Sequence, residues 1–192
     1  MKKKIFDCFC YFNEDYLLEL RFETLWNDVD FFVICESTFT FSGLPKPLNF
    51  NHDRFSRYRE KIIYLVFDKH PKDFDNAWHY ERSQRNFLIN GLGNANSSDW
   101  VIVSDVDEIP NPNAIKAYNP FKYKRAALKQ LMYAYYLNNR WESGGEPVMW
   151  IGPKITTFDN LITFFGKSIE SVRNYRGCGL WRGVYKAYLN KF

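Results

Sequence analysis

The chain has 192 residues, of which 46% are hydrophobic and 25% are charged, and this balance predicts one soluble domain with a real core. The net charge of +4 is mild and the basic residues are scattered, which argues against nucleic acid as a partner. No apolar run reaches the roughly 20 residues of a membrane span, and the N-terminal segment MKKKIFDCFCYFNED lacks the cleavage site of a signal peptide.

The four cysteines form no CxxC pair, and Cys8, Cys10 and Cys35 lie in apolar runs where cysteine acts as a small hydrophobe, whereas Cys178 stands apart. This pattern predicts a reducing compartment without disulfides. With no membrane span and no leader, the sequence predicts a cytoplasmic protein. Peripheral association with a membrane is compatible with it.

The first half of the chain alternates between strand-like and helical patterns. Residues 4–12 predict a strand, and Asn13 is the expected N-cap of a helix that runs to Trp26. Short apolar runs at 31–35 and 61–67 predict buried strands.

The alternation of strand-like and helical patterns continues past residue 77. A helix is predicted over 78–92, closed by Gly91 and Gly93, and WVIVS at 100–104 predicts another buried strand. Asn111-Pro112 predicts the start of a short helix. The order of elements indicates an α/β sandwich with a largely parallel sheet.

Beyond Tyr118 the pattern is ambiguous, because AALKQLMYAYYLNN fits both a helix and a strand. Farther on, Asp159 is expected to be the N-cap of a helix that begins near Asn160. Glu170 is expected on the solvated face of a helix.

Three carboxylates follow the strand at 100–104 directly: Asp105, Asp107 and Glu108. Ligands of open α/β sheets bind beyond the carboxyl ends of the strands. Residues two apart point the same way on an extended backbone, so Asp105 and Asp107 can converge on one ion, and their hard oxygens suit Mn²⁺ or Mg²⁺. A solvated acidic turn, or Asp105 as a helix cap, is the competing interpretation. Glu108 is the third carboxylate, with a catalytic, capping or loop-orienting role.

Other metal or phosphate sites fit less well. An EF-hand needs glycine where Pro110 stands. The segment DVDEI resembles the nucleophile motif of haloacid-dehalogenase-like phosphatases. Such an enzyme also needs a later pair of acidic residues to complete its Mg²⁺ site, and the sequence after Glu108 contains no such pair.

Two further charged residues are candidates. Glu36 ends the strand at 31–35 and opens a loop rich in Ser, Thr and Pro, and loops at that edge commonly carry function. Arg85 carries a fixed positive charge, so it is a candidate for contact with substrate phosphates or for locking the loop that contains Asp105 and Asp107. Its alternative is an exposed pair with Glu81, four residues earlier.

Several blocks, in order, resemble glycosyltransferase family 17: DCFCYFNEDYLLELRFETL, DFFVICESTFTFSGLPKPLNF, ERSQRNFL and DWVIVSDVDEIPNP. The resemblance covers residues 5–112 and is looser over 126–157. It implies a GT-A-like nucleotide-sugar-binding sandwich, a divalent metal, UDP-N-acetylglucosamine as donor, a glycan or glycolipid acceptor, and inversion at the sugar. It assigns Asn13, Glu36 and Thr40 to the substrate crevice.

The resemblance leaves the catalytic base and the C-terminus open. Of the carboxylates downstream of the metal motif, Glu142 is favoured as the base because it flanks a flexible SGG loop. Family members continue into a Gly-Trp-His block, where this chain has GCGLWRGVYKAYLNKF. The expectation is one domain over 1–192, shortened at its C-terminus. A truncated reading frame and an inactive relative that binds a glycan or partner are the alternatives.

Overall fold

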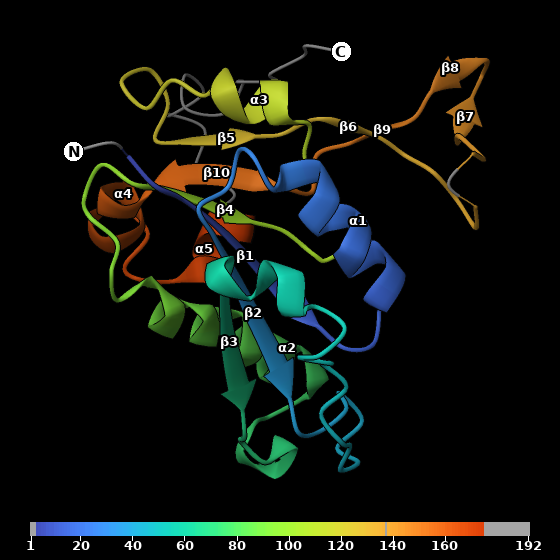
Figure 1. Cartoon of the computed structure of the whole chain (residues 1–192), viewed down its shortest axis with the longest axis vertical. Coiled ribbons are helices and arrows are strands. Elements are labelled where there is room, and N and C mark those ends of the chain that lie inside the picture. The colour runs from blue at the N-terminus through green and yellow to red at the C-terminus, as the bar shows by residue number, and fades with distance from the viewer. Residues whose placement is uncertain (1–2, 137, 175–192) are drawn as a thin grey trace.

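The structure, a computed structural model, describes residues 3–136 and 138–174. The segment GCGLWRGVYKAYLNKF, with Cys178, lies outside these described residues. Figure 1 shows the arrangement of the α-helices and strands, which are β1 (Ile5–Tyr11), α1 (Asp15–Leu25), β2 (Phe31–Ser37), β3 (Ile62–Phe67), α2 (Ala77–Phe87), β4 (Trp100–Val103), α3 (Pro112–Lys116), β5 (Arg125–Ala127), β6 (Gln130–Leu131), β7 (Glu142–Ser143), β8 (Glu146–Pro147), β9 (Met149–Trp150), β10 (Lys154–Thr157), α4 (Phe158–Thr163) and α5 (Ile169–Asn174).

The central sheet has the strand order β3-β2-β1-β4-β10-β5. The first four strands are parallel to one another, and β10 runs antiparallel to both of its neighbours. The predicted α/β class with a largely parallel sheet is therefore confirmed. The strand order also reverses at β1, because β2 and β3 extend the sheet to one side of β1 and β4 extends it to the other. Such a reversal opens a crevice at the carboxyl ends of the two diverging strands.

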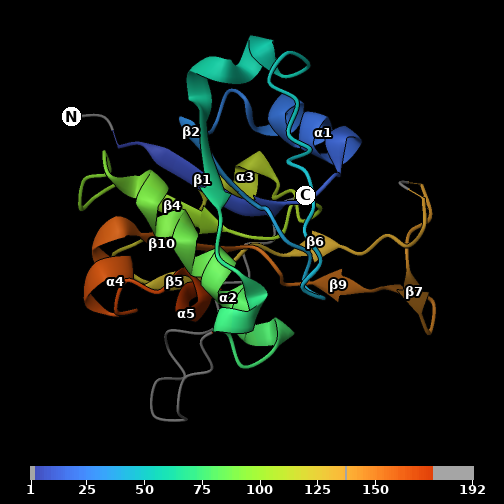
Figure 2. The ribbon, with the colours of Figure 1, turned by 90° about the horizontal axis from the view of Figure 1, so that it is seen from below.

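Helices cover both faces of the sheet. Figure 2 shows α1 and α3 on one side and α2, α4 and α5 on the other. Side chains of β1 alternate between these layers, so that Phe9 and Tyr11 belong to the core under α1, and Phe6 and Cys8 to the core under α2. Burying each large side chain contributes about 1.5–3 kcal/mol, and both cores are therefore substantial.

Four predicted helix boundaries can be compared with the structure. The helix over 78–92 is confirmed as α2, followed by the 3-10 helix η3 (Leu88–Leu92). Gly91 is needed within η3 because a Cβ there would overlap Val33 of β2. Asn111 caps α3 as predicted, by accepting a hydrogen bond from the backbone N–H of Asn113 at 2.8 Å.

Two predicted caps are wrong. The N-cap of α1 is Glu14, not Asn13, and the Glu14 carboxylate accepts hydrogen bonds from the backbone N–H groups of Phe12 and Asn13. The N-cap of α4 is Thr157, whose hydroxyl accepts from Asn160, whereas Asp159 lies inside the first turn. In both cases the true cap is one or two residues from the predicted one, but only Thr157 caps its helix with a side-chain oxygen, since the Glu14 carboxylate turns back to residues before α1.

The ambiguous stretch after Tyr118 is neither one helix nor one long strand. Between β5 and β10 the chain leaves the sheet and returns as a ribbon of short strands, which we call the arm (residues 130–150 except 137). Figures 1 and 2 show the arm extending away from the helices and the central sheet. Its base lies next to the loop that follows β4, since Gln130 Nε2 donates to the carbonyl of Ile109.

Candidate functional site

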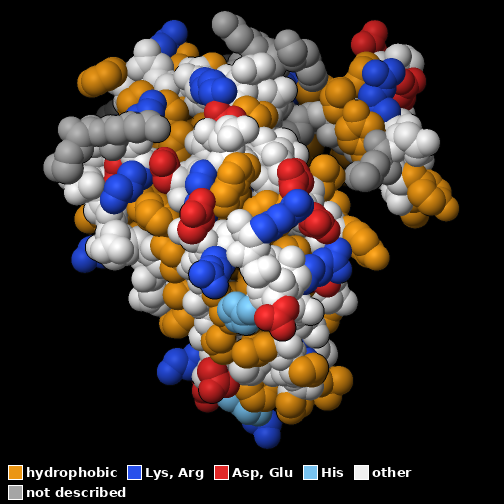
Figure 3. Space-filling view, in the orientation of Figure 1, with side chains coloured by type: hydrophobic (Ala, Val, Ile, Leu, Met, Phe, Trp, Pro, Cys, Tyr) orange, Lys and Arg blue, Asp and Glu red, His pale blue; other side chains and the backbone are white. Residues whose placement is uncertain are grey.

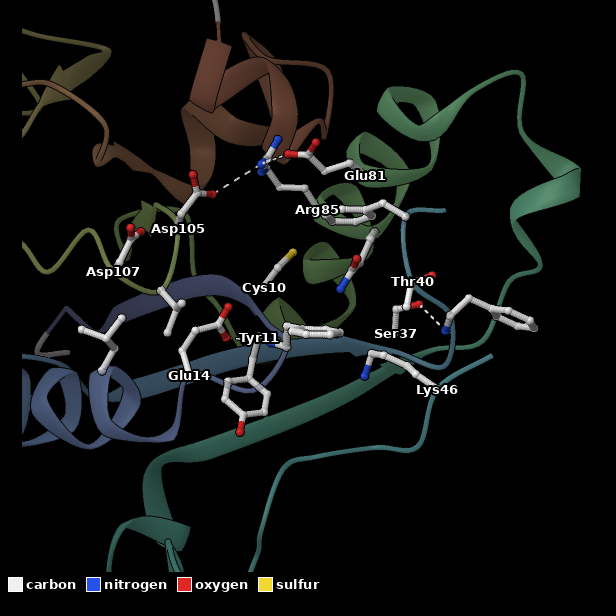
Figure 4. A pocket seen from close by; sticks show the side chains of 16 residues that line it. Cys10, Tyr11, Glu14, Ser37, Thr40, Lys46, Glu81, Arg85, Asp105 and Asp107 are labelled. Atoms are coloured by element: carbon white, nitrogen blue, oxygen red, sulfur yellow. Dashed lines mark hydrogen bonds and ion pairs between the residues drawn. The ribbon is translucent and has the colours of Figure 1, made fainter. Parts of the chain in front are cut away.

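A cavity of about 530 Å³ opens at the carboxyl ends of β1, β2 and β4. It lies at the reversal of strand order, where the topology places a ligand. Its walls come from the end of β1 and the start of α1 (residues 10–12, 14 and 17), from the end of β2 and the loop after it (residues 37, 39–41 and 46), from one side of α2, and from residues 105–107 after β4. Figure 4 shows polar side chains from all of these segments pointing into it.

The loop after β4, which we call the acidic loop (residues 105–108), brings its carboxylates against arginines. Arg173 of α5 donates to Asp105 Oδ2 at 2.6 Å and to Glu108 Oε1 at 2.9 Å, and its second terminal nitrogen lies 2.7 Å from Glu108 Oε2. Arg173 and Glu108 are both largely buried, with 10% and 7% of their side chains exposed. Arg173 therefore neutralises two of the three like charges. This role of Arg173 could not be predicted from the sequence, because Arg173 lies far along the chain from the loop.

A second arginine holds the backbone of the acidic loop from beneath. Arg21 of α1 is fully buried and forms a bidentate pair with the equally buried Asp7 of β1, at 2.6 and 2.7 Å. Its remaining terminal nitrogen donates to the carbonyl oxygens of Asp105, Val106 and Glu108 at 3.0–3.2 Å. The loop conformation is thus fixed by a buried cation that itself needs Asp7 for charge balance.

Arg85 lies on the α2 side of the same loop. It is 8% exposed, and it pairs with Glu81 and Glu170 at 2.6 Å each and with Asp105 at 3.4 Å. The Glu81–Arg85 pair therefore exists but is not an exposed surface pair. The expectation of a solvated Glu170 is wrong, because its carboxylate is mostly covered and bound to Arg85.

Asp107 differs from Asp105 and Glu108 because no arginine among the described residues pairs with its carboxylate, which is exposed at the cavity on the same side as Glu14 (Figure 4). Desolvation by the surrounding protein, followed by the like charges of Glu108 and Asp105, raises the pKa of Asp107 above its ordinary value. A nearby cation stabilises the charged form of a carboxylate whose pKa is raised in this way. Asp107 is therefore the carboxylate of the acidic loop that is best placed to meet a positively charged ligand.

The carboxylate oxygens of the acidic loop fit a divalent metal ion that takes most of its other ligands from a bound substrate and from water. Within residues 3–136 and 138–174 no group of three His, Cys, Asp or Glu side chains is arranged to hold a metal ion. Mg²⁺ and Mn²⁺ are commonly bound by one or two carboxylates together with substrate phosphates and water. Asp107, with Asp105 beside it, supplies such a partial set of hard oxygen ligands.

Glu36 is fully buried and orders the loop after β2. Its carboxylate accepts hydrogen bonds from Lys46 Nζ at 2.6 Å, from the backbone N–H groups of Asn49 and Phe50 at 2.6 and 3.1 Å, and from the Tyr64 hydroxyl at 2.7 Å. These donors come from one stretch of the loop after β2, residues 46–50, and from β3. The structure therefore gives Glu36 a role in shaping the cavity rather than in lining it.

The other predicted site residues are divided between the cavity and the outside. Thr40 lines the cavity, where its hydroxyl accepts from the backbone N–H of Leu44 at 3.0 Å. Asn13 is exposed and is not part of the cavity wall. Glu142 lies in β7 on the arm, with its carboxylate paired to Arg140, and the structure does not bring it to the cavity. Glu14 does line the cavity, although it was not among the predicted site residues, because it directly follows the residue expected to cap a helix.

Lys154 of β10 is a buried cation close to the acidic loop. Its Nζ donates to the carbonyl oxygens of Ile151 and Gly152. Burial, together with the guanidinium groups of Arg125 and Arg173, lowers the pKa of Lys154 from 10.5 to about 8.

We expect the contribution of Lys154 to the free energy of unfolding to rise with pH between about 8 and 10.5, because the unfolded chain then holds a proton that folded Lys154 has released. The stability of wild type relative to Lys154→Met should therefore rise across this range, although the buried thiols of Cys8 and Cys35, whose pKa values burial raises, act in the opposite direction in both proteins. The rise is about 3 kcal/mol at most, the equivalent of a pKa difference of about 2.5. Urea denaturation across this pH range, with wild type and Lys154→Met compared, measures it. The variant is expected to lack this rise, and parallel curves for both proteins would contradict the prediction.

The surface carries no large field of one sign on the face shown in Figure 3, where basic and acidic side chains are interspersed. Surface ion pairs also join α1 to the segment before β3, such as Arg54 with Glu19 and Arg57 with Glu23. None of the helices in the described part of the chain combines the length and apolar character needed to cross a bilayer.

Comparison with known proteins gives one consistent result. The sequence model of glycosyltransferase family 17 matches residues 1–144. The β-1,4-mannosyl-glycoprotein 4-β-N-acetylglucosaminyltransferases of Homo sapiens and Rattus norvegicus are each 31% identical to this chain over 145 residues, and that of Mus musculus is 30% identical. Each match covers 67% of this chain and 26% of the relative, so the chain spans about a quarter of the length of these relatives.

Proposed function

Because the chain belongs to glycosyltransferase family 17, we propose that it is a metal-dependent inverting transferase of GT-A type. Its donor is UDP-N-acetylglucosamine and its acceptor is a hydroxyl group of a glycan or glycolipid. The observation that carries the proposal is the exposed carboxylate of Asp107 on a cavity at the reversal of strand order. The printed names of the mammalian relatives, which are N-acetylglucosaminyltransferases, support the choice of sugar.

Asp107 and Asp105 are the residues that hold Mn²⁺ or Mg²⁺ in this proposal. When bound, such an ion neutralises the negative charge that grows on the departing diphosphate. Arg85 reaches the cavity wall beside Asp105 and supplies a fixed positive charge that can bind the phosphate oxygens. Arg173 and Arg21 act indirectly by keeping the acidic loop in place.

The acceptor hydroxyl must lose a proton to a base within hydrogen-bond reach. The cavity is lined by four carboxylates, of Glu14, Glu81, Asp105 and Asp107, and two of them are paired with Arg85. With Asp107 assigned to the metal, Glu14 is the carboxylate left for proton transfer. We place the base on Glu14 in preference to Glu142, which lies on the arm.

Two measurements on the same protein test this function. Calorimetric titration with UDP is expected to show binding that strengthens at least about tenfold when Mn²⁺ is present, which corresponds to about 1.4 kcal/mol. UDP release from UDP-N-acetylglucosamine with a glycan acceptor is then expected for wild type and lost in Glu14→Gln, which keeps UDP affinity.

Each contrary result has a distinct meaning. Absence of UDP binding with Mn²⁺ would refute the donor assignment. Binding without turnover on any glycan would favour an inactive relative that binds a glycan. Full turnover in Glu14→Gln, combined with loss in Glu142→Gln, would return the base to the arm.

A further inference from the structure

The arm exposes an unusual share of large side chains. Tyr135 and Tyr136 near its end are 98% and 73% exposed, and Trp141 and Trp150 closer to its base are 49% and 44% exposed. Figure 3 shows hydrophobic side chains along the arm at the upper right of the molecule. An isolated two-stranded ribbon buries too little surface to be stable alone in water, and exposed apolar surface of this kind marks a place where something binds.

The two tryptophans are neighbours along the ribbon. Trp150 of β9 stands opposite Gln130 of β6. The backbone of Trp141 is hydrogen-bonded to both Met132 and Val148, at 2.8 and 2.9 Å. Met132 lies two residues after Gln130, and Val148 lies two residues before Trp150. Trp141 is therefore separated from Trp150 by about two residues along the ribbon, at the base of the arm.

The base of the arm is joined to the end of the acidic loop, next to the residues of that loop that line the cavity. Trp150 Nε1 donates to Glu108 Oε1, and Gln130 Nε2 donates to the carbonyl of Ile109. Gly152 makes the first contact possible, because a Cβ at that position would overlap both the Glu108 carboxylate and the Trp150 indole nitrogen. The half-exposed Trp150 ring is therefore fixed in orientation beside the loop that carries Asp107.

The side chains around the exposed rings indicate which class of ligand the arm can bind. From 130 to 150 the sequence has one basic residue, Arg140, against two acidic ones, Glu142 and Glu146, which is unsuited to an anionic membrane or to nucleic acid. The rings are interspersed with amide and charged side chains that exchange hydrogen bonds with hydroxyl groups. An aromatic face flanked by such groups matches a pyranose, which has one C–H face and a rim of hydroxyls.

We propose that Trp150 and Trp141 form the platform for the acceptor saccharide, next to the cavity that takes the donor. The proposal rests on the glycosyltransferase function proposed above and adds the residues that select the acceptor. Because the platform begins beside the acidic loop and continues outward along the arm, it favours an oligosaccharide over a single sugar. The sugar unit nearest Trp150 presents its hydroxyl toward the cavity.

Direct binding of mannotriose and triacetylchitotriose to the full chain, measured by calorimetry and by saturation-transfer NMR without donor, tests the proposal. At least one trisaccharide is expected to bind, and more tightly than its monosaccharide. Trp141→Ala is expected to weaken that binding roughly tenfold, in line with the loss of one ring contact. Trp150→Phe, which keeps a ring but loses the indole N–H, is expected to weaken it less.

Matched controls separate this outcome from misfolding and from failure of the donor assignment. Phe121→Ala, at a 99% exposed ring outside the arm, is expected to leave saccharide binding unchanged. UDP affinity, measured separately, is expected to be the same in Trp141→Ala and wild type. Absence of trisaccharide binding, or equal binding by wild type and both tryptophan variants, would overturn the proposal. A wild-type dimer that Trp141→Ala dissociates without changing saccharide binding would assign the arm to self-association instead.

Discussion

Replacement of Arg21 with methionine is expected to lower the free energy of unfolding by about 3–5 kcal/mol, the usual cost of removing one partner from a buried ion pair. Arg21 and Asp7 are both fully buried, so the variant leaves the Asp7 carboxylate charged and uncompensated inside the core. The variant also removes three hydrogen bonds to the backbone of the acidic loop. Urea denaturation monitored by fluorescence and by circular dichroism measures the loss.

A double variant separates the two consequences. Asp7→Asn combined with Arg21→Met no longer buries an isolated charge, and it is expected to recover part of the lost stability. It does not restore the hydrogen bonds that hold the acidic loop, and Mn²⁺-dependent UDP binding is therefore expected to stay weak. A single variant within about 1 kcal/mol of wild type would show that Arg21 is not needed for charge balance.

Replacement of Asp107 with asparagine is expected to have the opposite profile, with a large effect on ligand binding and almost none on stability. Loss of the exposed carboxylate is expected to weaken UDP binding in the presence of Mn²⁺ by roughly 100-fold. The free energy of unfolding is expected to change by less than about 0.5 kcal/mol, because the side chain is exposed and its charge is repelled by its neighbours.

Calorimetry with and without a chelator provides the measurement for Asp107. In the presence of EDTA, wild type and Asp107→Asn are expected to bind UDP equally weakly, because Asp107 affects UDP affinity only by binding the metal ion. Asp53→Asn, at an exposed aspartate remote from the cavity walls, is the matched control and is expected to behave as wild type. Equal UDP affinity of Asp107→Asn and wild type with Mn²⁺ would remove Asp107 from the site.

The sequence predicted the elements that local patterns encode. Apolar runs located β1 to β4, and the acidic loop was found because three carboxylates directly after a buried strand repel one another and call for a positive partner. The topology then placed that loop correctly at a cavity, since parallel strands end at one edge of the sheet.

The partners of the acidic loop could not be predicted in the same way. Arg21, Arg85 and Arg173 lie 84, 20 and 68 residues from the Asp105 atoms that they contact, and nothing in a helical pattern tells which arginine turns inward. Glu36 was misjudged for a related reason, because a carboxylate at a strand end looks the same in sequence whether it faces a ligand or accepts hydrogen bonds from a loop. The arm was ambiguous because its short strands pair within the ribbon and lack a long period of either kind.

The position of β1 has a consequence for how the protein is made. Of the strands in the central sheet described above, β1 is synthesised before the others, yet it lies inside the sheet, and β4, its second neighbour, begins about 90 residues after β1 ends. During synthesis β1 can pair with β2 while its other edge, with the sequence IFDCFCY, stays open. An unpaired apolar edge is a template for association with other chains. The nascent polypeptide is therefore most vulnerable to aggregation in the interval before β4 emerges, and chaperone demand during translation should be concentrated there.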